Sequence, residues 1–222
     1  MNELIFIVQS LLVAAGSIVA LRLGKEALVA FMSLLCVLAN VFVLKQIQLF
    51  GLQVTAADAF SVGAILSLHL LQEFFGKKVA KKAIWTSFFC LILYIGASQV
   101  HLWYTPSIWD TTHVHFFEIL RFAPRVALAS LLVYLFSMQL DQFLYERLQA
   151  WCGGKYLLLR NFGLLAFIQL IDTTLFTFFG LYGIVHSVSQ VIVVSYAVKI
   201  VAIVGTTPAL LFLKKLKALK TR

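Results

Sequence analysis

Residues 161–181 read NFGLLAFIQLIDTTLFTFFGL, and this nearly continuous apolar run decides the fold class of the chain. As an α-helix rising about 1.5 Å per residue, such a run spans the roughly 30 Å hydrocarbon core of a bilayer. The run lacks the alternation that a lipid-facing β-strand needs. We therefore predict a transmembrane helix, and the polar residues inside it become candidates for function.

Six other apolar runs of similar length lie along the chain, at Leu4–Leu21, Ala27–Leu44, Thr55–Phe75, Ala83–Leu102, Phe117–Leu140 and Val188–Leu213. Of the 222 residues, 62% are hydrophobic and 12% are charged, whereas soluble domains are about 45–50% apolar and about 25% charged. The first run lacks the basic segment and cleavage site of a signal peptide, so we expect it to be retained. The sequence thus predicts an all-α, polytopic transmembrane bundle with seven spans and no strands.

The net charge is +9, and the basic residues are distributed along the chain as expected for a membrane protein with seven spans. With seven spans, most of the 18 basic residues fall in alternate loops and in the C-terminal tail, including the cluster from Lys77 to Lys82. The opposite loops carry few besides Lys45 and Arg121. Because basic loops stay on the cytoplasmic side, we expect an external N-terminus and a cytoplasmic C-terminus. Membrane lipid is the expected surrounding, and no nucleic-acid partner is expected.

Motifs for catalysis or cofactor binding are absent from the sequence. It contains no G-x-x-x-x-G-K-[ST] phosphate loop, no H-E-x-x-H and no G-x-S-x-G. Cys36, Cys90 and Cys152 have no metal-ligand spacing, and His113-x-His115 lacks further ligands at suitable spacing. We therefore expect no catalytic residues, no metal and no cofactor. Active transport would need a gradient, a partner or trapping of the substrate.

Asp172 is the clearest polar residue in an apolar span, and it shares a helix face with Gln169 and Thr173. Lys199 lies in the next span, with Ser195 one turn earlier on the same face. The short connection makes the two helices antiparallel neighbours, and both charges lie ~15 Å from the external surface. We expect them to meet. The pair either neutralises two buried charges or grips a ligand, and we favour the ligand, because a purely structural pair gains little over apolar packing.

Further polar residues occupy two other spans. Ser130, Tyr134, Ser137 and Asp141 form one helix face, which indicates either packing against polar helices or a ligand path. Arg125 follows Pro124 at the outer end, where the helix proper can begin, and its side chain either binds ligand or reaches the interface.

The second and third spans contribute the remaining candidates. Asn40 interrupts the second span, and Gln72 with Glu73 ends the third. Glu73 pairs either with the nearby lysine cluster or with a ligand. Thr55 followed by Asp58 resembles a helix-capping start, so we assign Asp58 to the helix N-terminus.

Five segments, in order, carry a family resemblance. They are Ala39-Asn40-x4-Lys45-Gln46-x4-Gly51 with Thr55-Ala56-Ala57-Asp58; Gln72-Glu73-x2-Gly76-Lys77-Lys78-x-Ala80; Arg125-Val126-Ala127-x-Ala129-Ser130 leading to Gln139-x-Asp141; Arg160-Asn161 with Gln169-Leu170-Ile171-Asp172-Thr173-x-Leu175-Phe176; and Lys199 with Pro208. The chain resembles the queuosine precursor transporters, earlier grouped as the vitamin uptake transporter family. Members typically have six helices, so this chain departs by adding its first span.

The resemblance implies a multi-pass inner-membrane importer of 7-deazaguanine bases, such as queuine or its cyano and aminomethyl precursors. It divides the chain into an additional helix (1–26), a six-helix transporter core (27–213) and a basic tail (214–222). The expected partner is this small-molecule substrate; a homodimer is compatible, but no residue points to one. The residues expected to bind substrate are Asn40, Gln72, Glu73, Arg125, Ser130, Asp141, Gln169, Asp172, Thr173 and Lys199.

Three alternatives stay open on the sequence alone. The chain could be the substrate-binding subunit of an energy-coupled transporter with a separate ATPase. It could be a membrane enzyme acting on a lipid or quinone. It could also be an assembly protein in which the buried charges only match helices to one another.

Overall fold

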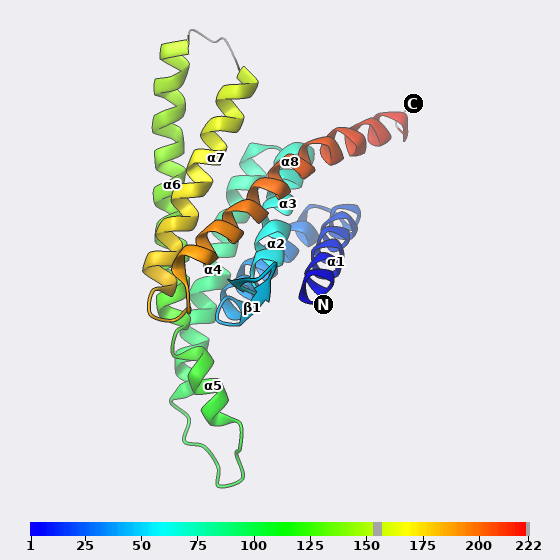
Figure 1. Ribbon diagram of the computed structural model, residues 1–222. Helices are drawn as coiled ribbons and strands as arrows, with labels where there is room; N and C mark the ends of the chain where they lie inside the picture. Colours follow the sequence, from blue (N-terminus) through cyan, green and yellow to red (C-terminus); the bar gives the residue numbers. More distant parts are fainter. Residues whose placement is uncertain (153–156, 221–222) are drawn as a thin grey trace.

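The computed structural model describes residues 1–152 and 157–220, and the side chains of 1–145, 147 and 163–204. The elements along the chain are α1 (Asn2–Leu23), α2 (Lys25–Phe42), β1 (Gln46–Leu49), β2 (Leu52–Thr55), α3 (Asp58–Phe75), α4 (Lys77–Leu102), α5 (His113–Leu120), α6 (Ala123–Cys152), α7 (Leu157–Phe176), the π-helical turn η1 (Thr177–Leu181) and α8 (Val188–Lys220). Helices therefore dominate the described chain (Figure 1).

Five of the described segments are long and apolar enough to cross a membrane, namely Asn2–Leu23, Lys25–Phe42, Lys77–Leu102, His113–Tyr145 and Gly163–Leu181. The described side chains of α8 end at Val204, and the part Val188–Val204 is apolar. The helix α3 is less hydrophobic than these segments, because it contains Asp58, His69 and Glu73. A multi-pass helical membrane protein is thus confirmed, whereas the count of seven spans stays a prediction.

The expectation of no strands is wrong at one place, between α2 and α3. The strands β1 and β2 form an antiparallel hairpin in which Ile47 pairs with Val54. The turn is made by Phe50 and Gly51, which both have positive φ, of 50° and 80°; two-residue hairpin turns need this conformation. Thr55, the predicted start of the third span, instead ends β2. Strands this short leave too little periodicity to detect in an apolar sequence.

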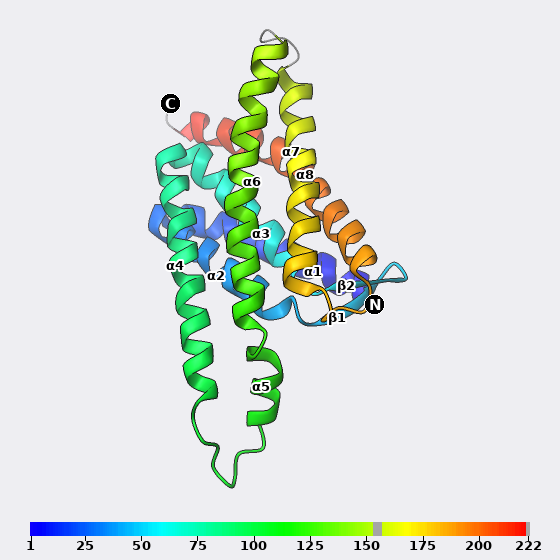
Figure 2. The ribbon, with the colours of Figure 1, turned by 90° about the vertical axis from the view of Figure 1, so that its left-hand side faces the viewer.

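The fifth predicted span is also divided in two. The chain turns at Arg121 and Phe122 between α5 and α6, and Pro124 lies in the first turn of α6, as its preference for that position predicts. With the preceding loop 103–112, α5 projects beyond the rest of the bundle (Figures 1 and 2). The long α6 and α7 run alongside each other at the opposite end of the molecule.

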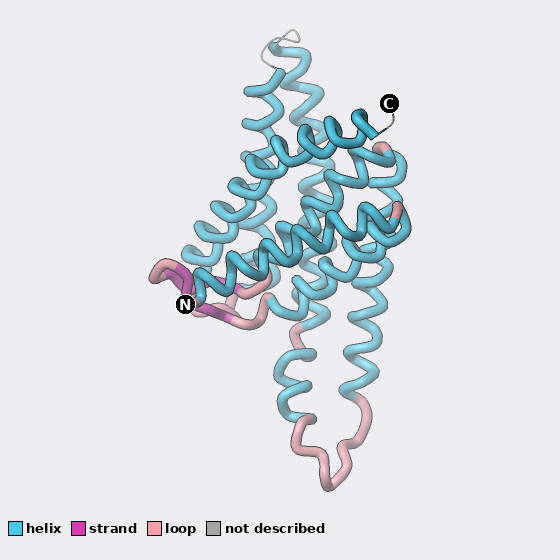
Figure 3. The backbone as a smooth tube through the Cα atoms, turned by 90° about the vertical axis from the view of Figure 1, so that its right-hand side faces the viewer, coloured by secondary structure: helices cyan, strands magenta, loops and turns pink. Residues whose placement is uncertain are grey.

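The helix α1 packs on α2 and α3 at the outside of the bundle (Figures 1 and 3). The side chain of Val13 of α1 packs directly against the backbone of α3 at Gly63, where an added Cβ would overlap it, as small residues allow between membrane helices. Ser17 and Ser67 share a buried hydrogen bond of 3.1 Å across this contact. The assignment of 1–26 as a unit separate from the transporter core stays a prediction.

The N-terminus and the β1–β2 hairpin lie toward one end of the bundle, and the C-terminal end of α8 lies toward the other (Figures 1 and 2). The charged side chains of the cluster from Lys77 to Lys82 are exposed at the start of α4. Lys155 and Arg222 lie outside the described residues, as do the side chains of Arg160 and the other tail lysines. The described part is compatible with the predicted sidedness, which stays a prediction.

Candidate substrate-binding cavity

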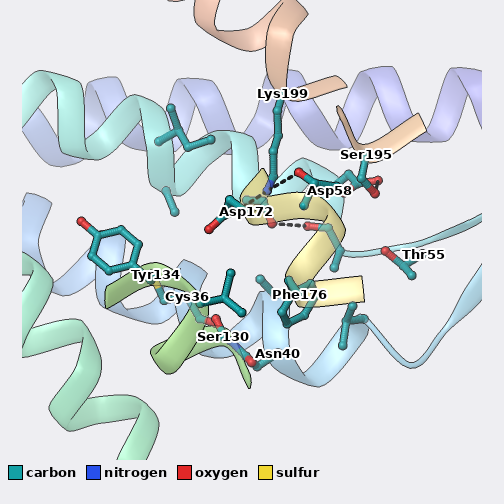
Figure 4. A pocket seen from close by; sticks show the side chains of 18 of the residues that line it. Cys36, Asn40, Thr55, Asp58, Ser130, Tyr134, Asp172, Phe176, Ser195 and Lys199 are labelled. Atoms are coloured by element: carbon teal, nitrogen blue, oxygen red, sulfur yellow. Dashed lines mark hydrogen bonds and ion pairs between the residues drawn. The ribbon is translucent and has the colours of Figure 1, made fainter. Parts of the chain in front are cut away.

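A cavity of about 240 Å³ lies where α2, α3, α4, α6, α7 and α8 converge. Figure 4 shows that its polar side chains come from helices far apart in sequence. Six of the residues expected to bind substrate line it: Asn40, Ser130, Gln169, Asp172, Thr173 and Lys199. The fold thus gathers most of the polar residues that interrupt the apolar spans into one place.

Lys199 and Asp172 form the predicted ion pair inside this cavity. The ammonium of Lys199 donates to Asp172 Oδ2 and to Thr173 Oγ1, both at 3.0 Å. The two charged side chains are 13% and 21% exposed. Ser137 of α6 donates to the second carboxylate oxygen of Asp172 at 3.3 Å. The antiparallel packing of α7 and α8 explains the pairing, and the expected meeting of the two charges is confirmed.

Asp58 is a second carboxylate in the cavity, and its assignment as a helix cap is wrong. The N-cap of α3 is Ala57, and no side-chain capping hydrogen bond forms there. Asp58 is instead 5% exposed and accepts a 2.9 Å hydrogen bond from Ser195 of α8. An acidic residue is common in the first turn of a helix, so the sequence shows no sign of a second role. The contact of Asp58 with α8 is visible only in the tertiary structure.

Asn40 lines the cavity and carries a hydrogen-bond acceptor that is unmatched within the described residues. Its Nδ2 donates to the carbonyl oxygen of Cys36 at 2.8 Å. Its Oδ1 is buried and accepts no hydrogen bond from the described part of the protein. A buried acceptor without a partner costs about 1–3 kcal/mol. A ligand N–H or O–H in the cavity would recover that cost.

Aromatic side chains supply the apolar walls. Phe88 of α4 and Tyr134 of α6 line the cavity and contact each other edge to face, with ring centroids 5.3 Å apart. Phe176, at the end of α7, lines it as well. Such rings favour a flat, conjugated guest, which can stack on them.

Four of the expected binding residues do not line the cavity: Gln72, Glu73, Arg125 and Asp141. Gln72 and Glu73 are exposed at the far end of α3, about 20 Å along the helix from Asp58. Asp141 lies one turn of α6 beyond Ser137. The length of each helix, together with the depth of the cavity, separates these residues from the others.

Arg125 forms hydrogen bonds with the backbone just after the C-terminal end of α7. Its Nε donates to the carbonyl oxygen of Phe179 at 3.0 Å, and its Nη2 donates to that of Tyr182 at 2.7 Å. These carbonyls follow the last turn of α7, where the helix leaves backbone acceptors without partners. The guanidinium thus fixes the turn that leads from α7 toward α8.

Replacing Arg125 by Met should therefore act on stability more than on substrate binding. We expect the midpoint of thermal unfolding in detergent to fall by roughly 2–4 °C, because two charge-assisted hydrogen bonds are lost. The apparent KM for uptake should change less than about twofold, because the residue is outside the cavity. A large rise in KM without loss of stability would place Arg125 in the binding site after all.

Long apolar helices around a small cavity that contains charged side chains are typical of a membrane protein that handles a small molecule. Comparison with known proteins identifies the family. Residues 55–213 match the family described as "Putative vitamin uptake transporter". The chain is also 32% identical, over 187 residues, to the "Probable queuosine precursor transporter" of Bacillus subtilis (strain 168), covering 81% of this chain and 82% of the relative.

The chain belongs to this transporter family, and the resemblance inferred from its segments is confirmed. It is accordingly a transporter of a small-molecule substrate, not an enzyme. No solved structure matches it. The matched range begins at Thr55, so α1 and most of the α2–β2 region lie outside it.

Proposed function

We propose that this chain imports queuosine precursors, 7-deazaguanine bases such as queuine or its cyano and aminomethyl precursors, across the inner membrane. The name of the Bacillus subtilis relative supports this substrate class. The predicted charge distribution supports an external N-terminus and a cytoplasmic C-terminus.

The chemistry of the cavity is the observation that carries the proposal. The pairing edge of a deazaguanine presents adjacent N–H donors, which suit carboxylates and the unmatched Oδ1 of Asn40. Its carbonyl oxygen suits the ammonium of Lys199 or the amide of Gln169. A purine without this edge would leave the buried groups unpaired, so the cavity would reject it.

The size of the cavity also favours a compact base. Its volume is about 240 Å³, below the roughly 300–1,000 Å³ of sites for drug-sized ligands. A bicyclic base between Tyr134 and Phe176 fits this scale better than a nucleotide or a lipid. We propose that the substrate contacts Asn40, Ser130, Gln169, Asp172, Thr173 and Lys199, together with Asp58.

The ion pair offers a way to couple binding to movement. Lys199 belongs to α8, whereas Asp172 belongs to α7. A substrate that competes for this pair changes what holds the two helices together, and it therefore shifts the balance between their arrangements.

Uptake in cells that lack both synthesis and import of deazaguanines tests the proposal. We expect labelled queuine or one of its precursors to accumulate only when the chain is expressed. Unlabelled deazaguanines should compete, and adenine should not. A well-inserted chain that takes up none of these bases would overturn the proposal.

The purified chain in liposomes then tests whether it works alone. Uptake without other proteins is expected for a secondary or facilitative transporter. Uptake that requires an added ATPase would instead make the chain a substrate-binding subunit.

A further inference from the structure

The charges in the cavity do not balance. Among the described side chains that line it, the acids are Asp58 and Asp172, and the single base is Lys199. The carboxylate of Asp172 already matches the ammonium of Lys199 at 3.0 Å. One carboxylate, that of Asp58, is left over.

Asp58 has no cation of its own among the described side chains that line the cavity: Lys199 is close enough to interact with it electrostatically, but that ammonium already pairs with Asp172. Asp58 is 5% exposed, and its hydrogen bond comes from the neutral hydroxyl of Ser195. As the first residue of α3, it also gains the partial positive charge of a helix N-terminus. A buried carboxylate needs a cation or must bind a proton.

The residues that line the cavity also include acceptors for hydrogen-bond donors of a ligand. Asn40 lines the same space and is 7% exposed, and its buried Oδ1 accepts no hydrogen bond from the described residues. Asp172 accepts from both Lys199 and Ser137. A guest that brings several N–H groups, one of them on a cation, would satisfy both Asn40 and Asp58.

We propose that the cavity selects a guest carrying an alkylammonium group, and that Asp58 is the carboxylate that binds this group. The inference rests on the proposed function and narrows its substrate class. An aminomethyl 7-deazaguanine carries such an ammonium at neutral pH, whereas the cyano compound is uncharged. Asn40, Asp172 and Lys199 then remain for the ring edge.

The ratio of the two uptake rates tests this assignment. Labelled aminomethyl and cyano 7-deazaguanine are supplied separately at equal concentration to cells expressing the chain, and rates are normalised to inserted protein. The wild-type chain should favour the aminomethyl base by about tenfold or more, as expected for a charge-assisted contact. Asp58→Asn should lower this ratio at least about tenfold, because the carboxylate is lost.

Two further variants keep the result interpretable. Asp58→Glu retains the charge and should retain the preference, even where its absolute rates fall. Glu118→Gln makes the same acid-to-amide change at an exposed residue outside the cavity, and it should leave the ratio unchanged.

The outcomes separate this inference from the proposed function. Equal uptake of both bases by the wild-type chain, or a ratio that Asp58→Asn leaves unchanged, would overturn the role of Asp58 while the import function stands. Failure of the wild-type chain to take up either base would overturn the import function, and the inference with it.

Discussion

Asp172→Asn is expected to lower uptake of a deazaguanine base by about a hundredfold or more, because the donor edge of the substrate loses charge-assisted hydrogen bonds of about 1.5–3 kcal/mol each. The amide cannot balance the ammonium of Lys199, which is 13% exposed. It also takes from the substrate the carboxylate proposed to bind its donor edge. Uptake of labelled substrate, normalised to the inserted protein, measures the effect.

A double variant separates binding from simple charge neutralisation. Asp172→Asn combined with Lys199→Gln removes both charges and leaves two neutral side chains. If the pair only matches α7 to α8, this variant should recover stability and uptake together. We expect stability in detergent to recover while uptake stays lost, and a return of uptake would contradict a role for the pair in holding substrate.

Asn40→Leu is expected to raise the apparent KM for uptake by about tenfold to a hundredfold, because the variant loses a buried acceptor reserved for the ligand. The same variant should be as stable as the wild type or more stable. Its Oδ1 has no hydrogen-bond donor in the described protein, so leucine removes an unmet polar group from an apolar helix. Concentration-dependent uptake and thermal unfolding in detergent measure the two effects.

Ser33→Ala is the matched control for this prediction. Ser33 is also a buried polar residue of α2, but its hydroxyl hydrogen-bonds the hydroxyl of Ser87 at 3.0 Å and does not line the cavity. Its replacement should lower stability and leave KM near the wild-type value. A loss of stability in Asn40→Leu without a change in KM would mean that Asn40 serves the fold rather than the substrate.

The differences between the predicted site and the lining of the cavity have a common origin. Gln72, Glu73 and Asp141 are polar residues in or beside apolar spans, and the family resemblance implies that they bind substrate. A helix rises by about 1.5 Å per residue, so residues near the end of a long helix lie far from a cavity at its middle or its other end. Conversely, Asp58 follows a normal capping pattern, and it joins the site only because Ser195 of α8 reaches it.

The sequence by itself determined the lipid surroundings, the mainly helical structure and the contact between Asp172 and Lys199. Long apolar runs require helices in lipid, since backbone groups have no other partners there. The position of Asp172 and Lys199 on either side of a short turn was enough to pair them.

Only the tertiary structure decided which other polar residues meet. The cavity joins Asn40 of α2 and Asp58 of α3 to the pair held by α7 and α8. The relative placement of helices that are distant in sequence depends on side-chain packing over their whole length, such as the close approach at Gly63. Local periodicity gives the faces of each helix, but it does not specify which faces pack together.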